Sequence, residues 1–356
     1  MTDKSQPAIE TDALVIGAGP VGLFQVFQLG LLGIRAHVVD ALPHAGGQCV
    51  ELYGDKPIYD IPGVPVCTGR ELAAKLLTQI TPMGAVFHYG QEVSTLKRQP
   101  DQRWLAETSA GTRFITKTIF IAAGVGAFQP RALKLEGLER LAPGQVWSTT
   151  PDDAAVAGKD IVVLGGHAQA IATALRFCGG ASSSKANARS VTLIHRREVF
   201  DADDATLSAL AQARQSGALQ FMAGQLTGLT EVQGQLQTLL VLDADTRTRP
   251  VPAGILIPCL GLSPKLGPVA QWGLELERKQ LCVDTEKFAT SESGIFAVGD
   301  INTYPGKKKL ILCGFHEATL AAYAAAALVF PGQEIHLQYT TTSSKLHARL
   351  GVSHPL

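Results

Sequence analysis

The chain has 356 residues, of which 46% are hydrophobic and 17% are charged, so we expect two or three domains with large packed cores rather than disorder. Basic and acidic residues number 31 each, and the resulting net charge of zero argues against a nucleic-acid-binding protein and a polybasic membrane anchor. The first ten residues lack the pattern of a signal peptide, and the apolar stretch over residues 320–330 is shorter than the ~20 residues of a membrane span. We therefore expect a cytoplasmic protein, in which residues 320–330 form a buried helix.

Cysteine spacing bears on metal and redox chemistry. The six cysteines are Cys49, Cys67, Cys178, Cys259, Cys282 and Cys313. No two of them form a CxxC or CxxxxC motif, so we expect neither a metal centre nor a redox-active disulfide, but free and mostly buried thiols.

The first motif in the chain is typical of a dinucleotide-binding βαβ unit. Residues 13–16 read as an apolar strand, and Gly17-Ala18-Gly19-Pro20-Val21-Gly22 follows directly. A helical run over residues 23–32 comes next, and the second strand, residues 36–39, ends at Asp40. The spacing G-x-G-x-x-G between a strand and a helix, with an acidic residue after the next strand, predicts a nucleotide site.

Each residue of this motif has an expected role. Gly17 permits the tight turn, Gly19 lets a pyrophosphate approach the main chain, and Gly22 lets helix and strand pack closely. The pyrophosphate is expected on the free N–H groups at the start of the helix. Asp40 is expected to accept hydrogen bonds from the ribose hydroxyls.

The same plan occurs a second time. An apolar strand over residues 160–164 leads into Gly165-Gly166-His167-Ala168-Gln169-Ala170 and a helical run over residues 171–177. The duplication predicts two dinucleotide-binding domains with α/β packing. We expect four further strands, at residues 115–123, 191–194, 254–257 and 295–298. We expect a surface loop at residues 179–184.

Three later segments resemble the thioredoxin reductase-like flavoproteins. They are Gly46-Gly47-Gln48, residues 118–124 (TIFIAAG) and residues 290–300 (TSESGIFAVGD). The resemblance implies that the first site binds FAD and that Asp300 binds its ribityl chain.

Other segments resemble one group of that family, the ferredoxin–NADP reductases of the thioredoxin reductase-like type. The similar segments are residues 40–48, 53–60, 122–130, 266–268, 272–274, 304–307 and the C-terminal extension 338–344, and the resemblance covers roughly residues 12–352. It implies an α/β fold with two Rossmann-like (three-layer ββα) domains. The FAD domain is then discontinuous, at residues 1–128 and 259–356, with the NAD(P)H domain at 129–258.

The resemblance also implies an activity. Such an enzyme is a homodimer that transfers electrons between NADPH and ferredoxin, or flavodoxin, through FAD. Hydride transfer occurs between the cofactors, so no catalytic acid or base is expected.

Matching positions imply the residues that contact FAD. These are Asp40, Gln48, Tyr53, Val93, Phe128, Asp300 and Ser344 or the nearby Thr341. Tyr53 and Tyr339 are expected to stack on the two faces of the flavin. His316 and Glu317 are expected at the start of the last helix, where the helix dipole could stabilise a reduced flavin. The alternative for His316 is an ordinary surface histidine. The alternative for Tyr53 and Tyr339 is an ordinary half-buried residue, and the path of the tail that carries Tyr339 cannot be read from the sequence.

The second nucleotide site departs from the family pattern. The expected NADPH ligands are Gly165, Gly166, His167, Arg196 and Arg197. His167 stands where the family has glycine, so it either obstructs the pyrophosphate or binds it. Arg196 and Arg197 suit a 2′-phosphate, and Lys185 and Arg189 are candidate substitutes for a missing arginine.

Acidic residues follow the two arginines. Asp201, Asp203 and Asp204 would repel a phosphate. Two alternatives to an NADPH-dependent reductase therefore stay open. One is an FAD-binding redox-sensing or binding module that has lost NADPH turnover, and the other is an NADH-dependent flavin reductase.

Overall fold

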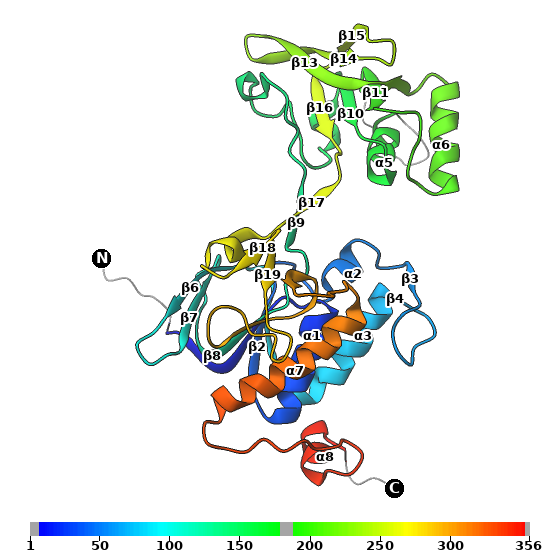
Figure 1. The fold of residues 1–356 in the computed structure, drawn as a ribbon. Helices are drawn as coiled ribbons and strands as arrows, with labels where there is room; N and C mark the ends of the chain where they lie inside the picture. The colour runs from blue at the N-terminus through cyan, green and yellow to red at the C-terminus, as the bar shows by residue number, and fades with distance from the viewer. Residues whose placement is uncertain (1–6, 179–187, 353–356) are drawn as a thin grey trace. The chain divides into compact units, whose positions relative to one another are not determined.

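The computed structural model describes residues 7–178 and 188–352, which form two compact units (Figure 1). One unit comprises Met1–Ala127 and Pro264–Leu356, and the other comprises Phe128–Ser263. The boundaries expected after residues 128 and 258 thus lie near those observed after residues 127 and 263. The surface loop predicted over residues 179–184 lies outside the described residues.

A mostly parallel sheet forms the centre of the discontinuous unit. Its strand order is β5-β2-β1-β8-β7-β6, and β20 pairs with β8. The parallel strands are β1 (Ile9–Ile16), β2 (Ala36–Val39), β5 (Val86–His88), β8 (Arg113–Ile121) and β20 (Ile295–Ala297). The antiparallel strands are β6 (Val93–Arg98) and β7 (Trp104–Thr108). Residues 13–16 of β1 are buried on both faces, as expected for a parallel strand covered on both sides.

Three helices cover one face of this sheet (Figure 1). They are α1 (Pro20–Leu32), α3 (Gly69–Ile80) and α7 (Ile311–Val329). The α3 helix begins with a capping box, in which Thr68 and Glu71 satisfy each other's main-chain N–H groups. Residues 320–330, predicted as a buried helix, mostly lie in α7.

Alanines along one side of α7 let it pack closely on α1 and β8. Ala318, Ala321, Ala322, Ala325 and Ala326 are all 0% exposed. Within residues 7–178 and 188–352, α7 is the helix long and apolar enough to span a membrane by length and composition alone. It contacts α1 and β8, so these alanines form part of the unit's core.

The continuous unit has three layers. Its central parallel sheet has the order β12-β11-β10-β16. The strands are β10 (Asp160–Leu164), β11 (Ser190–His195), β12 (Gln220–Ala223) and β16 (Ile255–Pro258). Helices α5 (Ala168–Phe177) and α6 (Asp204–Gln215) pack on one face, and an antiparallel sheet of β13 (Gln225–Val232), β14 (Gln235–Leu242) and β15 (Thr248–Pro252) packs on the other. This confirms the predicted α/β class with dinucleotide-domain topology.

The remaining elements are short. They are α2 (Gly47–Glu51), β3 (Pro57–Ile58), β4 (Cys67–Thr68), η1 (Thr81–Met83), β9 (Ala127–Pro130), η2 (Leu138–Arg140), α4 (Asp153–Val156), β17 (Leu262–Lys265), η3 (Gly267–Gln271), β18 (Leu276–Glu277), β19 (Gln280–Cys282), η4 (Gly299–Ile301), β21 (Asn302–Thr303) and α8 (Ser344–Leu350).

Candidate functional site

The turn between β1 and α1 has the geometry that its glycines predict. Gly17 has φ +108°, and a Cβ there would lie 2.5 Å from the carbonyl oxygen of Ala122. A Cβ on Gly22 would lie 1.9 Å from the carbonyl oxygen of Gly17, which no side chain allows. A Cβ on Gly19, by contrast, would meet nothing within 4 Å. Two glycines are thus required by packing, while Gly19 faces open space where a ligand can approach the main chain.

Asp40 braces this turn from the end of β2. Its carboxylate accepts hydrogen bonds from the main-chain N–H groups of Ala18 at 2.5 Å and Leu42 at 2.7 Å. Burial raises the pKa of Asp40, and these two hydrogen bonds act in the opposite direction. The structure therefore shows a role in shaping the turn, and the ribose contact of Asp40 stays a prediction.

The segment Gly46-Gly47-Gln48 lies against the same turn. Gly46 donates its N–H to the carbonyl oxygen of Ala18 at 2.9 Å. A Cβ on Gly47 would lie 3.0 Å from the Cα of Gly19, and a Cβ on Gly124 would lie 2.7 Å from Nε2 of Gln48. Three motifs that are far apart in the sequence therefore meet around one turn.

Asp300 reaches the same region from η4, just after β20. The preceding residue, Gly299, lies against Val21 of the first turn, with 3.3 Å from its hypothetical Cβ to a methyl carbon of Val21. Burial raises the pKa of Asp300, whereas the positive charges of Lys307 and Lys309 lower it. In the described part of the chain, no side-chain or main-chain donor is hydrogen-bonded to this half-buried carboxylate, so it is available to a ligand hydroxyl.

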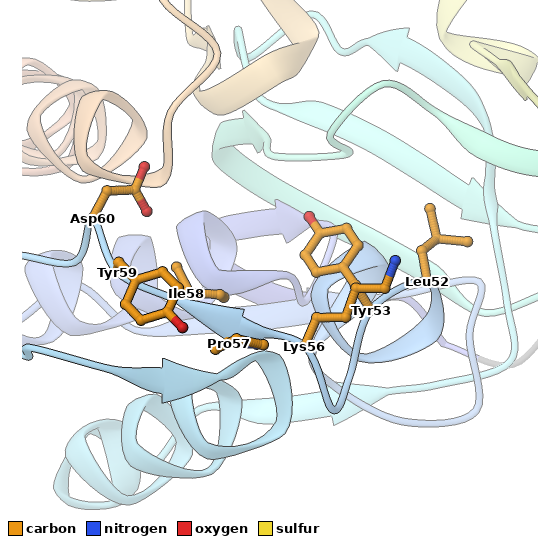
Figure 2. Close-up of a pocket in the computed structure, with 7 residues that line it drawn as sticks. All are labelled: Leu52, Tyr53, Lys56, Pro57, Ile58, Tyr59 and Asp60. Carbon is orange, nitrogen blue, oxygen red and sulfur yellow. The ribbon is translucent and has the colours of Figure 1, made fainter. Parts of the chain in front are cut away.

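Tyr53 borders a pocket of about 490 Å³ (Figure 2). The pocket is lined by Leu52, Tyr53, Lys56, Pro57, Ile58, Tyr59 and Asp60. The thiol of Cys49 donates a hydrogen bond to the hydroxyl of Tyr53 across 3.6 Å. Burial and this neighbouring thiol raise the pKa of Tyr53, and burial also raises the pKa of Cys49. Cys49 is therefore a protonated packing residue and a poor nucleophile.

Of two further predicted FAD ligands, Val93 and Phe128, the structure describes the side chain of Val93 alone. The side chain of Val93 is 1% exposed and packs in the core with Ile16 and Val39, so only its main chain is available to a ligand. The side chain of Phe128 lies outside the part that the structure describes.

The C-terminal extension packs at the far end of α1. Arg349 of α8 donates a hydrogen bond to the carbonyl oxygen of Leu31, whereas the glycine-rich turn precedes the opposite end of this helix. Tyr339 is 66% exposed, and Thr341 and Ser344 lie beside it in the same extension. Within one chain, the structure therefore does not bring Tyr339, Thr341 and Ser344 to the first nucleotide turn.

Two imidazole rings lie against the second nucleotide turn and the residue that faces it. A Cβ on Gly165 would lie 2.2 Å from the carbonyl oxygen of Cys259, and one on Gly166 would lie 2.4 Å from the ring of His195. His167 precedes α5, and its Nε2 lies 3.2 Å from the position of a Cβ on Gly261. Its Nδ1 is buried and has no hydrogen-bond partner within the described ranges. Burial lowers the pKa of His195, and the positive charges of Arg196 and Arg197 lower it further.

The two arginines remain available for a phosphate. Arg196 and Arg197 are exposed, and the described residues supply no carboxylate within ion-pair distance of either. The main chain of Asp201 pairs with the turn, since its N–H donates to Gly166 at 2.9 Å and its carbonyl accepts from Ala168 at 2.8 Å. One of the first N–H groups of α5 is therefore already used by the protein.

Two of the neighbouring acidic residues have a structural explanation. Asp203 caps α6 by accepting a hydrogen bond from the N–H of Thr206 at 2.8 Å. Asp204 is the first residue of that helix. Negative charge at a helix start is stabilising, so these carboxylates are explained by α6.

The prediction that Arg189 could substitute as a phosphate ligand was wrong. Its guanidinium forms an ion pair with Asp160 at the first residue of β10, and Ser190 donates to the same carboxylate at 2.7 Å. The nucleotide turn follows the opposite end of β10. Lys185, the other candidate, lies outside the described residues.

The expected positions of His316 and Glu317 were also wrong, because α7 begins at Ile311 and places both residues in its second turn. Glu317 is fully buried and bound by four donors. Sequence reasoning missed this cluster because all four donors lie in residues 299–307, before the start of α7, and no motif links that stretch to the helix. Among the residues that the structure describes, no cluster of three or more His, Cys, Asp or Glu side chains could hold a metal ion.

Comparison with known proteins gives a consistent picture. Residues 11–325 match the family model described as pyridine nucleotide-disulphide oxidoreductase. A protein named ferredoxin–NADP reductase from Polaromonas sp. is 57% identical over 98% of this chain and 94% of its own. Another of that name, from Albidiferax ferrireducens, is 57% identical over 99% of this chain and 98% of its own.

Solved structures show the same fold. Thioredoxin reductase from Lactococcus lactis (FR conformation) matches with a TM-score of 0.54 at 23% identity, over 90% of this chain and 99% of its own.

Proposed function

Because the chain belongs to the pyridine nucleotide-disulphide oxidoreductase family, we propose that it is a ferredoxin–NADP reductase, a flavoprotein that transfers electrons between NADPH and ferredoxin through FAD. The observation that carries the proposal is the convergence of separate motifs on one turn. Gly19 leaves the main chain open there, and Asp300 offers a carboxylate that the described protein groups leave without a donor. An adenosine diphosphate and a ribityl chain supply the phosphate and hydroxyl groups that fit these two positions.

Each part of the FAD site has a task in this proposal. The N–H groups at the start of α1 bind the pyrophosphate, Asp40 binds the ribose, and Asp300 binds the ribityl hydroxyls. Tyr53 packs on the flavin ring beside the pocket that it lines. Bound FAD supplies the exchange between two-electron and one-electron transfer, which no side chain of the protein can provide.

The pyridine nucleotide is proposed to bind at the turn between β10 and α5. Arg196 and Arg197 are the groups that would distinguish NADPH from NADH, because guanidinium groups match the oxygens of a 2′-phosphate. An anaerobic titration with each nucleotide, in which reduction is followed as loss of the visible flavin absorbance, tests this directly. We expect NADPH to bleach the flavin at lower concentration than NADH, and Arg196→Ala to abolish that preference.

His167 favours a second candidate function, an FAD-binding redox-sensing or binding module without NADPH turnover. His167 is the N-cap residue of α5, where the family pattern has a glycine, and its ring lies against Gly261 at the same turn. The two functions differ in one result. If neither NADPH nor NADH reduces the bound flavin, and His167→Gly does not restore reduction, the binding module is supported and the reductase is refuted.

We also propose a cytoplasmic homodimer, with ferredoxin or flavodoxin as electron acceptor. The exposed tail residues Leu337 and Tyr339, at 63% and 66%, support an interface with a second chain. Because α8 packs at the end of α1 that is far from the glycine-rich turn, Tyr339 would contact the flavin of the second chain and not that of its own. Sedimentation of the full chain and of a chain ending at residue 336 tests this, with a monomeric full chain as the refuting result.

A further inference from the structure

The ion pair between Lys307 and Glu317 is buried beside the candidate flavin site. The Lys307 side chain is 7% exposed and that of Glu317 is 0% exposed. Removing a charge from water costs roughly several kcal/mol, so the attraction between two buried charges often does no more than offset this cost. A buried pair is therefore weak evidence for a gain in stability. We therefore looked for a role of this pair in fixing the geometry of the neighbouring main chain.

The pair holds both main-chain polar groups of Gly299. The Gly299 N–H donates to the carboxylate of Glu317 at 2.7 Å, and its carbonyl oxygen accepts from the ammonium of Lys307 at 2.9 Å. Gly299 has φ +81°, a left-handed conformation that glycine adopts without steric cost. Because Gly299 directly precedes Asp300, this clamp sets the direction in which the Asp300 side chain leaves the main chain.

Two further donors make the cluster rigid. The side-chain amide of Asn302 donates to Glu317 at 2.9 Å and to the carbonyl oxygen of Ala297 at 2.8 Å. The hydroxyl of Tyr304 donates to Glu317 at 2.9 Å. Glu317 thus joins α7 to the end of β20 and to the turn that carries Asp300.

We propose that the Lys307–Glu317 pair positions Asp300 for FAD and sets the electrostatic field that the bound flavin experiences. The proposal rests on FAD binding as proposed above, and on neither NADPH nor ferredoxin. The two charges act on Asp300 in opposite directions, since Lys307 lowers its pKa and Glu317 raises it. With both partners present their effects oppose each other, and removing one partner exposes the effect of the other.

Two single variants test both halves of the proposal. Glu317→Gln leaves a buried positive charge, which favours the electron-rich reduced flavin, so the midpoint potential of bound FAD should rise. Lys307→Met leaves a buried negative charge, so the potential should fall. Each should also release FAD faster, on the order of tenfold, because the Gly299–Asp300 turn loses a charge-assisted hydrogen bond. The double variant Lys307→Met/Glu317→Gln should return the potential towards the wild-type value.

Two more variants separate charge from structure. Lys308→Met removes the adjacent exposed lysine and should leave FAD release and potential near wild type. Tyr304→Phe removes a donor to Glu317 without leaving a lone charge, so it should speed FAD release and leave the potential unchanged. It also keeps the test decisive if a single charge variant does not fold.

The outcomes are distinguishable from a failure of the proposed function. Wild-type protein that binds no FAD would refute the flavoprotein itself. FAD-loaded Glu317→Gln and Lys307→Met with unchanged potentials and FAD release would refute only the role of the pair. A potential shift in Tyr304→Phe as large as in Glu317→Gln would refute the electrostatic half.

Discussion

Gln25 offers a direct test of the packing of α1. Its side chain is 0% exposed, and neither its amide nitrogen nor its amide oxygen has a hydrogen-bond partner within residues 7–178 and 188–352. A buried polar group without a partner costs about 1–3 kcal/mol. Gln25→Leu removes that cost and keeps a side chain of similar size, so the free energy of unfolding should rise by about 1–3 kcal/mol. Urea unfolding of the FAD-loaded protein, followed by tryptophan fluorescence and circular dichroism, measures the change.

The same substitution at Gln28 is the matched control. Gln28 lies in the same helix but is only partly buried, so Gln28→Leu should change the unfolding midpoint much less. Gln25→Met, which is unbranched and adapts to an irregular cavity, separates overpacking by leucine from the polar effect. A loss of stability in both Gln25→Leu and Gln25→Met would refute the reasoning, since it would mean that the amide has a favourable partner.

Three further predictions concern pH, FAD and NADPH. His37 and His88 form a hydrogen bond of 2.9 Å between β2 and β5, and burial lowers the pKa of both, so the folded state favours their neutral forms. Their stabilising contribution is present above the unfolded pKa of about 6.5 and is lost as the pH falls below it. His37→Phe should therefore reduce the difference between urea midpoints measured on the two sides of that value, and an unchanged difference would contradict this. Asp300→Ala should weaken FAD binding by about 1.5–3 kcal/mol, measured by equilibrium dialysis, whereas equal affinity would rule out the ribityl contact. His167→Gly should lower the Michaelis constant for NADPH by removing a side chain from the path of the pyrophosphate, and a higher constant would instead identify His167 as a phosphate ligand.

The first nucleotide turn could be predicted because its determinants are local. Gly17, Gly19 and Gly22 lie within six residues, and the main-chain conformation they allow depends mainly on their own strand and helix. The same holds for the strand and helix at the second turn, although the place of the His167 ring could not be predicted. That ring packs toward Gly261, which lies beyond β16 and whose position depends on how β10 and β16 pair.

The failures arose where a side chain is partnered across the fold. Arg189 pairs with Asp160 because β10 and β11 are parallel and in a register that sets Asp160 opposite Ser190. Sequence distance gave no indication of that register. Glu317 likewise lies in α7, whereas its four donors lie in the loop over residues 299–307 that precedes this helix. The tail of the chain meets Leu31, and no local pattern predicts either contact.

The discontinuous unit also has a consequence for synthesis on the ribosome. Its central strand β8 pairs with β20 in a register that sets Ile121 opposite Ala297. All of Phe128–Ser263 is translated between these two strands, so the continuous unit leaves the ribosome whole while the sheet of the other still lacks β20. Domains generally fold as units during synthesis. The inserted unit can therefore complete its core first. Until β20 arrives, Ile119–Ile121 at the end of β8 lack a partner on one edge, whereas Arg113–Thr116 are already paired with β7. A chaperone or a second nascent chain can bind such an unpaired edge.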